Sequence, residues 1–263
     1  MIGVRVAIHG AAGRMGQRLV ALAEADSALV LVAAMESPDH PRIGEDAGVV
    51  AGIGPIEVPL SATLEVPADV VVDFSVPAAA EVILATCVQR GVALVMATTG
   101  MTEAQTAKIV AAAQRIPVIW APSMSLAVNL TMKLAEIAAR ALADKDADVE
   151  IIERHHRFKE DAPSGTALKF GQLISAIMGQ ASHRHGRGGR PGRRPHGEIG
   201  YHALRTGDNP GEHTIVLAML GESIELTVKA TNRDCYASGA ISAAKYLVGQ
   251  APGLYGLQDV LGL

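Results

Sequence analysis

The chain of 263 residues is poor in aromatic side chains, in cysteine and in long apolar runs. Phe, Tyr and Trp make up only 3% of it, so the core has to be built from Ala, Val, Leu and Ile. Cys87 and Cys235 have no CxxC spacing, which is typical of reduced thiols in a reducing compartment. Because no apolar run reaches about 18 residues and glycine soon interrupts the first stretch, we expect a cytoplasmic protein without membrane segments.

The chain also lacks an excess of positive charge. A net charge of −4 argues against bulk electrostatic binding to nucleic acid or to a membrane surface. The hydrophobic content of 49% is typical of a globular protein, and the length suits one large domain or two modest ones.

One segment departs from this balance. Residues 182–197 hold five arginines and five glycines and no acidic residue, which is typical of a mobile loop. The segment also resembles a nucleic-acid patch, but it has no aromatic side chain to stack on a base. A solvated loop that reaches an anionic cofactor or a neighbouring subunit is therefore the favoured interpretation.

The first half of the sequence is typical of a nucleotide-binding fold. An apolar strand at 4–9 runs into the glycine-rich turn 10–16 and then into a helical apolar period. Such a turn lets backbone N–H groups approach a pyrophosphate, although a GxxGxxG spacing also occurs in packed strand–helix turns. A second strand, 29–35, is followed by Glu36, where this fold places an acid for ribose hydroxyls; a solvated strand-end acid is the alternative.

Further strands alternate with helices up to about residue 121, and three of them end in polar turns at 73–75, 98–100 and 121–123. Near-continuous apolar strands between helices predict a Rossmann-like, doubly wound parallel sheet, which binds ligands at its carboxyl edge. Each polar turn can also be plain loop chemistry. We expect a dinucleotide-binding domain at 1–125, joined by a carboxyl-terminal segment at 238–263.

The second half predicts an α+β domain with a mixed sheet at 126–237. Apolar helical periods cover 126–143 and 165–178, and strand-like segments cover 199–205, 213–220 and 223–230.

The stretch 150–168 combines the chemistry of a site. An apolar strand leads to His155, His156 and Lys159, and then to a Pro-Ser-Gly-Thr turn that starts a helix. The N–H groups of Gly165 and Thr166 and the Ser164 and Thr166 hydroxyls can hold a carboxylate, while Ser164 can equally be a simple N-cap. A metal is not expected, because adjacent histidines point apart on a strand and no third ligand has suitable spacing.

Seven motifs occur together in an order that closely resembles the 4-hydroxy-tetrahydrodipicolinate reductase (dihydrodipicolinate reductase) family over nearly the whole chain. They are GAAGRMG at 10–16, DFS at 73–75, ATTG at 97–100, ERHHRFKEDAPSGTAL at 153–168, LRTGDNPGEHT at 204–214, NRDCYASGAI at 232–241 and GLYGLQDVLGL at 253–263. The 153–168 block is highly specific and the glycine turn weakly so. This resemblance implies an NADH- or NADPH-dependent reduction of a small ring dicarboxylate on the diaminopimelate route to lysine. It also implies a homotetramer in which the second domain binds the substrate and joins the subunits through its sheet.

The resemblance also implies roles for individual residues. His155 corresponds to the proton donor or acceptor and Lys159 to the proton donor, whereas His156, Gly165 and Thr166 contact the substrate. The residues that it assigns to the cofactor are Gly10, Ala11, Ala12, Gly13, Arg14, Met15, Glu36, Thr98, Thr99, Gly100, Ala121, Pro122, Ser123 and Met124.

Three positions depart from the family pattern. The family usually has Asn-Phe at Ser123-Met124, often has His at Val228, and in members that prefer NADPH tends to carry Arg at Ser37. Since Glu36 would repel a 2′-phosphate, we expect NADH to be used at least as well as NADPH, although Arg14 or Arg42 can still take the phosphate. Two other hypotheses remain: a different dinucleotide enzyme, such as an amino-acid dehydrogenase, and a non-catalytic RNA-binding protein that uses the arginine segment.

Overall fold

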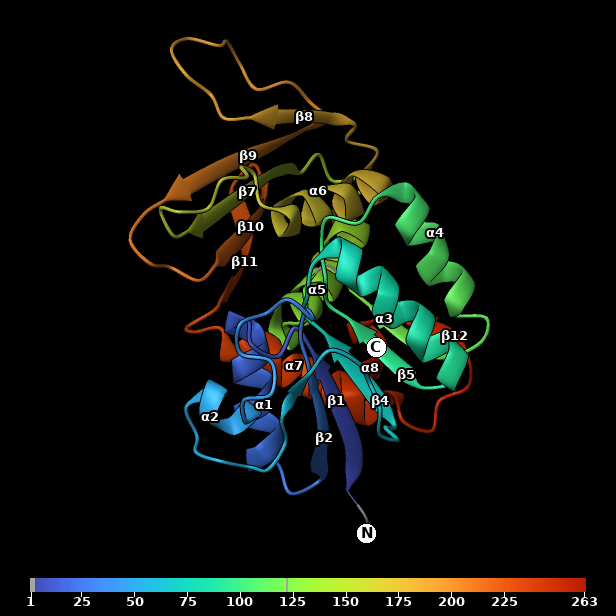
Figure 1. Cartoon of the computed structure of the whole chain (residues 1–263). Coiled ribbons are helices and arrows are strands. Elements are labelled where there is room, and N and C mark those ends of the chain that lie inside the picture. Colours follow the sequence, from blue (N-terminus) through green and yellow to red (C-terminus); the bar gives the residue numbers. More distant parts are fainter. Residues whose placement is uncertain (1–2, 122) are drawn as a thin grey trace. The chain divides into compact units, whose positions relative to one another are not determined.

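The computed structural model describes residues 3–121 and 123–263, and its contacts divide the chain into two units. One unit comprises Met1–Leu126 and Arg233–Leu263, and the other comprises Ala127–Asn232. Figure 1 shows both units, with the carboxyl-terminal elements in red within the first. Within the described ranges, no helix has the length and apolar character needed to cross a membrane.

A parallel sheet of seven strands forms the centre of the first unit, in the spatial order β12-β6-β5-β4-β1-β2-β3. The strands are β1 (Val4–His9), β2 (Leu29–Met35), β3 (Leu60–Ser61), β4 (Val70–Asp73), β5 (Ala93–Met96), β6 (Pro117–Trp120) and β12 (Gly253–Tyr255). The order from β3 to β6 is that of a Rossmann fold. The expected doubly wound α/β fold is therefore confirmed.

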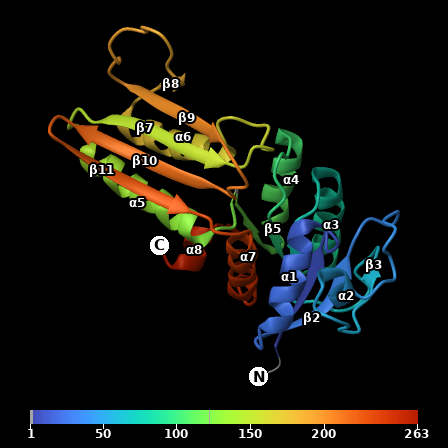
Figure 2. The ribbon, with the colours of Figure 1, turned by 90° about the vertical axis from the view of Figure 1, so that its left-hand side faces the viewer.

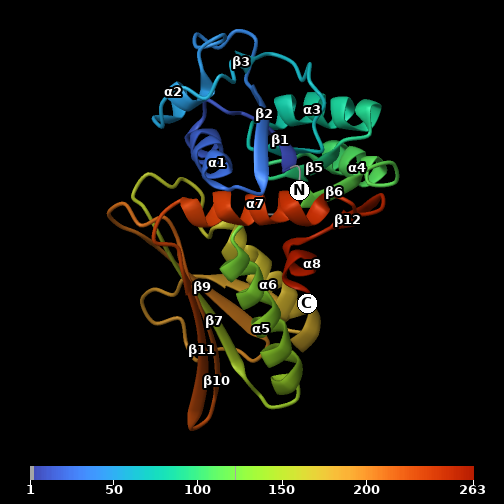
Figure 3. The same ribbon diagram turned by 90° about the horizontal axis from the view of Figure 1, so that it is seen from below.

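Helices cover both faces of this sheet, because successive side chains of each strand point to opposite sides. Their bounds are α1 (Arg14–Ala25), α2 (Ala47–Ala51), α3 (Pro77–Arg90), α4 (Glu103–Ala112), α7 (Asp234–Leu247) and α8 (Leu257–Leu261). One buried cluster joins α1, α2, α7 and α8 to one face, and another joins α3 and α4 to the other. Helix α7 contacts β4, β5 and β6, and Figure 3 shows it lying across the strands.

The second unit is a mixed five-stranded sheet, in the order β11-β10-β7-β9-β8. Its strands are β7 (Asp148–His155), β8 (Ser182–His185), β9 (Glu198–Arg205), β10 (Glu212–Met219) and β11 (Glu222–Lys229). Helices α5 (Leu126–Leu142) and α6 (Gly165–Met178) pack through one apolar cluster against one face. Figure 2 shows the sheet with both helices behind it, so that no helix of this unit covers the opposite face.

The structure differs from the sequence expectations mainly at the ends of elements. The interpretation of 182–197 as a loop throughout is wrong, because Ser182–His185 pairs with β9 as strand β8. The helix predicted from Ser238 begins at Asp234. Four further short elements were not predicted: α2, β3, β12 and α8. They are too short for a periodic pattern to reveal them.

Candidate active site

The helix-covered face of β7 changes from apolar to ionisable along the strand. Val149 and Ile151 are fully buried in the core of the second unit, and Glu153 and His155 follow on the same face. Side chains at alternate positions of a strand share a face, so the strand itself brings these two together. Both remain buried, at 1% and 8% exposed.

Glu153 is the centre of a hydrogen-bond network. Its carboxylate lies 2.6 Å from Nδ1 of His155 and accepts bonds from both terminal nitrogens of Arg205, at 2.7 and 2.8 Å. It also accepts the backbone N–H of Ser164 at 3.0 Å. Burial alone would raise the pKa of Glu153, but the hydrogen bonds from His155, Arg205 and Ser164 outweigh it and lower the pKa to about 2.

A second histidine completes the buried part of the site. His213 on β10 is the register partner of Glu153, and its Nε2 lies 2.9 Å from Oγ of Ser164. The rings of His155 and His213 meet edge to face with centroids 5.2 Å apart. Burial, helped by the nearby His155 and Lys159, lowers the pKa of His213 to about 4, so this imidazole is neutral near pH 7.

The start of α6 has the geometry of an anion site. Ser164 is the N-cap, and its Oγ accepts the N–H of Ala167 at 3.1 Å. Within the described residues, the N–H groups of Gly165 and Thr166 donate to no protein acceptor, as is usual in a first helical turn. A Cβ placed on Gly165 would meet no atom within 4 Å, so the space over this end is open. Both interpretations of Ser164, cap and anion ligand, fit this arrangement.

Lys159 lies in the loop that connects β7 to α6. Its ammonium forms an ion pair with Asp161 at 2.7 Å, and its backbone N–H donates to the carbonyl of His156 at 3.1 Å. Arg205 reaches the same loop, donating to the carbonyl oxygen of Asp161 at 2.5 Å. His156 follows the strand, with its ring 6.2 Å from that of Phe158. The second unit thus gathers all the proton-handling and substrate-binding candidates around one loop.

The first unit contains the glycine turn that was predicted to hold a nucleotide. Gly10 has a φ of 79°, and a Cβ there would lie 2.7 Å from the carbonyl oxygen of Phe74. A Cβ on Gly16 would lie 2.0 Å from the carbonyl oxygen of Gly10, so the first turn of α1 packs directly on the end of β1. Only glycine permits this close approach.

Glu36 lies beside this turn. Its carboxylate accepts the backbone N–H of Ala12 at 3.0 Å and that of Ser37 at 2.9 Å. A carboxylate held at the end of β2, next to a glycine turn and a helix N-terminus, is the arrangement that fits a dinucleotide. The residues of this turn therefore fit the nicotinamide cofactor that the sequence predicted.

Asp73 organises the ends of β1, β4 and β5. This fully buried carboxylate accepts hydrogen bonds from the hydroxyls of Ser75 and Thr98 and lies 2.6 Å from Nδ1 of His9. The Thr98 hydroxyl thus points inward, whereas Thr99 and Gly100 are exposed. Any contact of Thr98 with a cofactor therefore requires its backbone.

The remaining cofactor candidates differ in their exposure to solvent. Arg14 is exposed and Met15 is partly buried at the start of α1. Ala121 and Met124 are 4% and 2% exposed and belong to the core, so only their backbone is available to a ligand. The Ser123 hydroxyl accepts the N–H of Ser125, and Pro122 lies outside the described residues.

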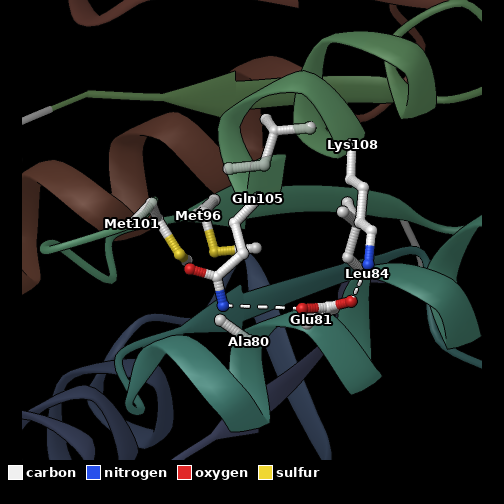
Figure 4. Close-up of a pocket in the computed structure, with 8 residues that line it drawn as sticks. Ala80, Glu81, Leu84, Met96, Met101, Gln105 and Lys108 are labelled. Carbon is white, nitrogen blue, oxygen red and sulfur yellow. Dashed lines mark hydrogen bonds and ion pairs between the residues drawn. The ribbon is translucent and has the colours of Figure 1, made fainter. Parts of the chain in front are cut away.

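The described residues of the first unit line at least two hollows. A cavity of about 450 Å³ is lined by His9 and Met35, at the ends of β1 and β2, by residues 62–64 and by one flank of α3. The hollow between α3 and α4 in Figure 4 is only about 10 Å³. Glu81 and Lys108 form an ion pair at its rim, and the space suits a single water rather than a substrate. In the described part of the chain, no three His, Cys, Asp or Glu side chains are placed to hold a metal ion.

The opposite face of β7 carries a second clamped carboxylate. Glu150 accepts hydrogen bonds from Arg187 at 2.7 and 2.9 Å and from Nε of Arg194 at 3.1 Å, and it lies 2.7 Å from Nε2 of His202. Burial would raise the pKa of Glu150, but these partners lower it to about 2. Two of the five loop arginines are thereby paired within this unit, which weakens the RNA-binding hypothesis.

Sequence reasoning missed Glu153, Arg205 and His213. The signal was present, because β7 and β10 each place ionisable residues at positions whose strand period is otherwise apolar: Glu153 follows Val149 and Ile151, and His213 precedes Ile215 and Leu217. A charge on the buried face of a strand needs a partner, and that need indicates a site.

Comparison with known proteins agrees with this arrangement. Residues 4–124 match the family described as "Dihydrodipicolinate reductase, N-terminus", and residues 127–261 match "Dihydrodipicolinate reductase, C-terminus". A protein of Rhodopirellula baltica named 4-hydroxy-tetrahydrodipicolinate reductase is 54% identical over 99% of this chain and 96% of its own. A protein of the same name from Alkalilimnicola ehrlichii is 50% identical over 98% of this chain and 99% of its own.

Solved structures share the fold. The dipicolinate-bound dihydrodipicolinate reductase of a Paenisporosarcina species superposes with a TM-score of 0.77 and 27% identity, covering 97% of this chain and 98% of its own. An amine dehydrogenase from Mycobacterium smegmatis has a TM-score of 0.65 at 12% identity, with coverage of 97% and 95%, and shows the fold alone. On the family matches and the identities to these relatives, the chain belongs to the dihydrodipicolinate reductase family.

Proposed function

We propose that this chain reduces 4-hydroxy-tetrahydrodipicolinate, by way of dihydrodipicolinate, to tetrahydrodipicolinate, with NADH or NADPH as the reductant. This reaction belongs to the diaminopimelate route to lysine, which operates in the cytoplasm. The observation that carries the proposal is the second unit's loop: Glu153 holds His155 and the N-cap Ser164 at its two ends, and Lys159 pairs with Asp161 between them. Relatives of 42–54% identity bear the name of this activity.

The start of α6 is proposed to hold one carboxylate of the substrate. The N–H groups of Gly165 and Thr166 and the Ser164 hydroxyl are hydrogen-bond donors at the positive end of a helix, where an anion is stabilised. Lys159 adds a positive charge in the same loop, and His156 and Thr166 are further substrate contacts in this proposal. A small dicarboxylate matches these groups in charge and in size.

The protons are proposed to come from Lys159 and His155. When bound, the reduced nicotinamide supplies a hydride, and negative charge then develops on the ring that accepts it. Lys159 neutralises that charge by donating the proton of its ammonium group, and His155 exchanges protons through Nε2. The substrate first loses its 4-hydroxyl as water to give dihydrodipicolinate, and one hydride and one proton are then added across a double bond of that ring.

The glycine turn, Glu36, Thr98 to Gly100 and Ala121 to Met124 are proposed to hold the cofactor. Glu36 accepts hydrogen bonds from a ribose diol but repels a 2′-phosphate. Ser37 brings no cation, and Arg42 is paired with Glu45 at 2.9 Å. We therefore propose that NADH is used at least as well as NADPH. Comparing kcat/KM for the two tests this, and a preference for NADPH of about a hundredfold contradicts it.

The second unit is proposed to assemble a homotetramer through the face of its sheet that no helix of this unit covers. Analytical ultracentrifugation of the purified chain tests the assembly.

The activity itself is tested by oxidation of NADH or NADPH when the substrate is generated from pyruvate and aspartate semialdehyde. Turnover that pyridine-2,6-dicarboxylate inhibits is expected. Without turnover, or without competition by this planar analogue, the proposed activity is wrong.

A further inference from the structure

Glu153 receives donors from three different segments of the second unit. His155 lies two positions further along β7, Arg205 ends β9, and Ser164 is the residue before α6. Glu153 is 1% exposed, and its four hydrogen bonds to these three residues are 2.6 to 3.0 Å long. A buried group that three segments share fixes their relative positions more firmly than an exposed one.

The contact with His155 sets the ring's tautomer. An ionised carboxylate has no proton to give, so Nδ1 of His155 has to be the donor in this 2.6 Å bond. The neutral ring then carries its lone pair on Nε2, the nitrogen that remains for proton exchange. The lowered pKa of Glu153 agrees with an ionised carboxylate over the whole physiological range.

The contact with Ser164 sets the entry into α6. Its N–H is held by Glu153, while its Oγ caps the helix and lies 2.9 Å from Nε2 of His213. The position of this residue fixes the first turn, and therefore the direction of the N–H groups of Gly165 and Thr166. Arg205 meanwhile offsets the charge of Glu153 and holds the carbonyl of Asp161.

We infer that Glu153 is a positioning residue for the reductase reaction, which fixes the orientation of His155 and the start of α6 at the same time. Glu153 acts through these two neighbours and touches no substrate itself. The inference rests on the proposed function for its kinetic part. Removing the Glu153 carboxylate should therefore have two separable effects. The value of kcat should fall because His155 is no longer oriented, and KM should rise because Ser164 and the start of α6 are no longer held.

A double-mutant cycle separates these effects. A well-placed general acid or base contributes ~100-fold or more to the rate, and Glu153→Gln should remove only the part that depends on its orientation. We therefore expect this substitution to lower kcat about tenfold or more. In the background of His155→Gln the same change should alter kcat by less than about twofold, because the group it orients is gone. The rise in KM should persist in both backgrounds. An equal loss of kcat in both backgrounds overturns the inference.

Two variants guard against a purely structural explanation. Glu150→Gln removes a carboxylate with the same kinds of partners on the other face of β7, and it should leave kcat unchanged. Glu153→Asp keeps the buried charge, but its shorter side chain cannot reach His155 and Arg205 together, so kcat should fall here too. Wild-type kcat in Glu153→Asp, or an equal loss in Glu150→Gln, contradicts the inference.

A spectroscopic readout is independent of turnover. In protein labelled with ¹⁵N-histidine, the His155 signals, identified by their absence in His155→Gln, should show protonated Nδ1 and unprotonated Nε2 at alkaline pH. Glu153→Gln should give a mixture of both tautomers. A mixture already present in the wild type overturns the inference, whereas an inactive wild type with the expected tautomer overturns only the proposed function.

Discussion

Glu150 and Glu153 lie on the same strand and have nearly the same electrostatic surroundings. Each is clamped by arginine, each lies within 2.7 Å of a histidine ring nitrogen, and each has its pKa lowered to about 2. The two glutamates differ in the segments that contribute their hydrogen-bond partners. The partners of Glu153 border the β7–α6 loop or contact it: His155 ends β7, Ser164 precedes α6, and Arg205 of β9 also donates to the carbonyl of Asp161. Those of Glu150 belong to the arginine segment 182–197 and to β9 on the opposite face.

This comparison shows that a strongly lowered pKa does not by itself identify a catalytic site. Structural ion-pair networks and active sites perturb carboxylates in the same way. The distinction comes from the open donors nearby: the start of α6 offers N–H groups to a ligand. Substitutions on the site face should therefore change turnover or substrate binding, and those on the outer face should change stability.

The largest effect is expected for Lys159→Ala. Removing the ammonium eliminates the proposed proton donor, so kcat should fall by about a hundredfold or more while the fold is retained. Lys169→Ala is the matched control, because Lys169 is an exposed lysine on α6. Steady-state oxidation of NADH measures both. Wild-type turnover of the Lys159 variant would remove this residue from the mechanism.

Ser164→Ala should have the next largest effect. It removes a hydroxyl that is proposed to bind the substrate carboxylate, so KM should rise about tenfold, and it removes an N-cap, so the free energy of unfolding should fall by about 1 kcal/mol. Thr102→Ala removes the cap of α4 and should cost a similar stability without changing KM for the dicarboxylate. An unchanged KM in Ser164→Ala means that the residue is a cap and no more.

Gly200→Ala should affect the outer face alone. A Cβ on this residue would lie 1.9 Å from a carboxylate oxygen of Glu150, so the carboxylate has to leave its arginine partners. We expect a loss of about 1 kcal/mol in the free energy of unfolding by urea, with kcat unchanged. Loss of kcat without loss of stability would show that the two faces of β7 are coupled.

The smallest difference between the Glu150 and Glu153 variants is expected in the loss of stability at acidic pH. Both glutamates have a pKa of about 2 in the folded protein and the ordinary glutamate pKa of 4.5 when unfolded. Their stabilising contribution is therefore complete above about pH 4.5 and is lost as the pH falls toward about 2. Glu150→Gln and Glu153→Gln should reduce the slope of stability against pH in this range to a similar extent. If only one of the two substitutions reduces the slope of stability against pH, the two glutamates do not have similar electrostatic surroundings.

The sequence predicted the fold well because its signals are local. The glycine turn at 10–16 and the alternation of apolar strands with helices are each contained in a short stretch, and both were confirmed. The 182–197 segment was misjudged because its partners are remote: Arg187 and Arg194 pair with Glu150, 37 and 44 positions away. Composition alone does not reveal an acid contributed by another strand.

The candidate site was only partly visible for the same reason. His155, Lys159 and Ser164 lie in one block that a single motif reveals, and their roles stay predictions. Glu153 lies in the same block, but its role depends on Arg205 and His213 from two other strands. Register across a sheet, rather than any motif, brings these three together.

The most direct test of the central claim is calorimetric binding of pyridine-2,6-dicarboxylate to the wild type, Glu150→Gln and Glu153→Gln. If only the helix-covered face of β7 supports the substrate site, Glu150→Gln binds like the wild type. Glu153→Gln then binds about tenfold more weakly, because the start of α6 is no longer held. Equal weakening in both variants, or in neither, would contradict the claim that Glu153 organises the site.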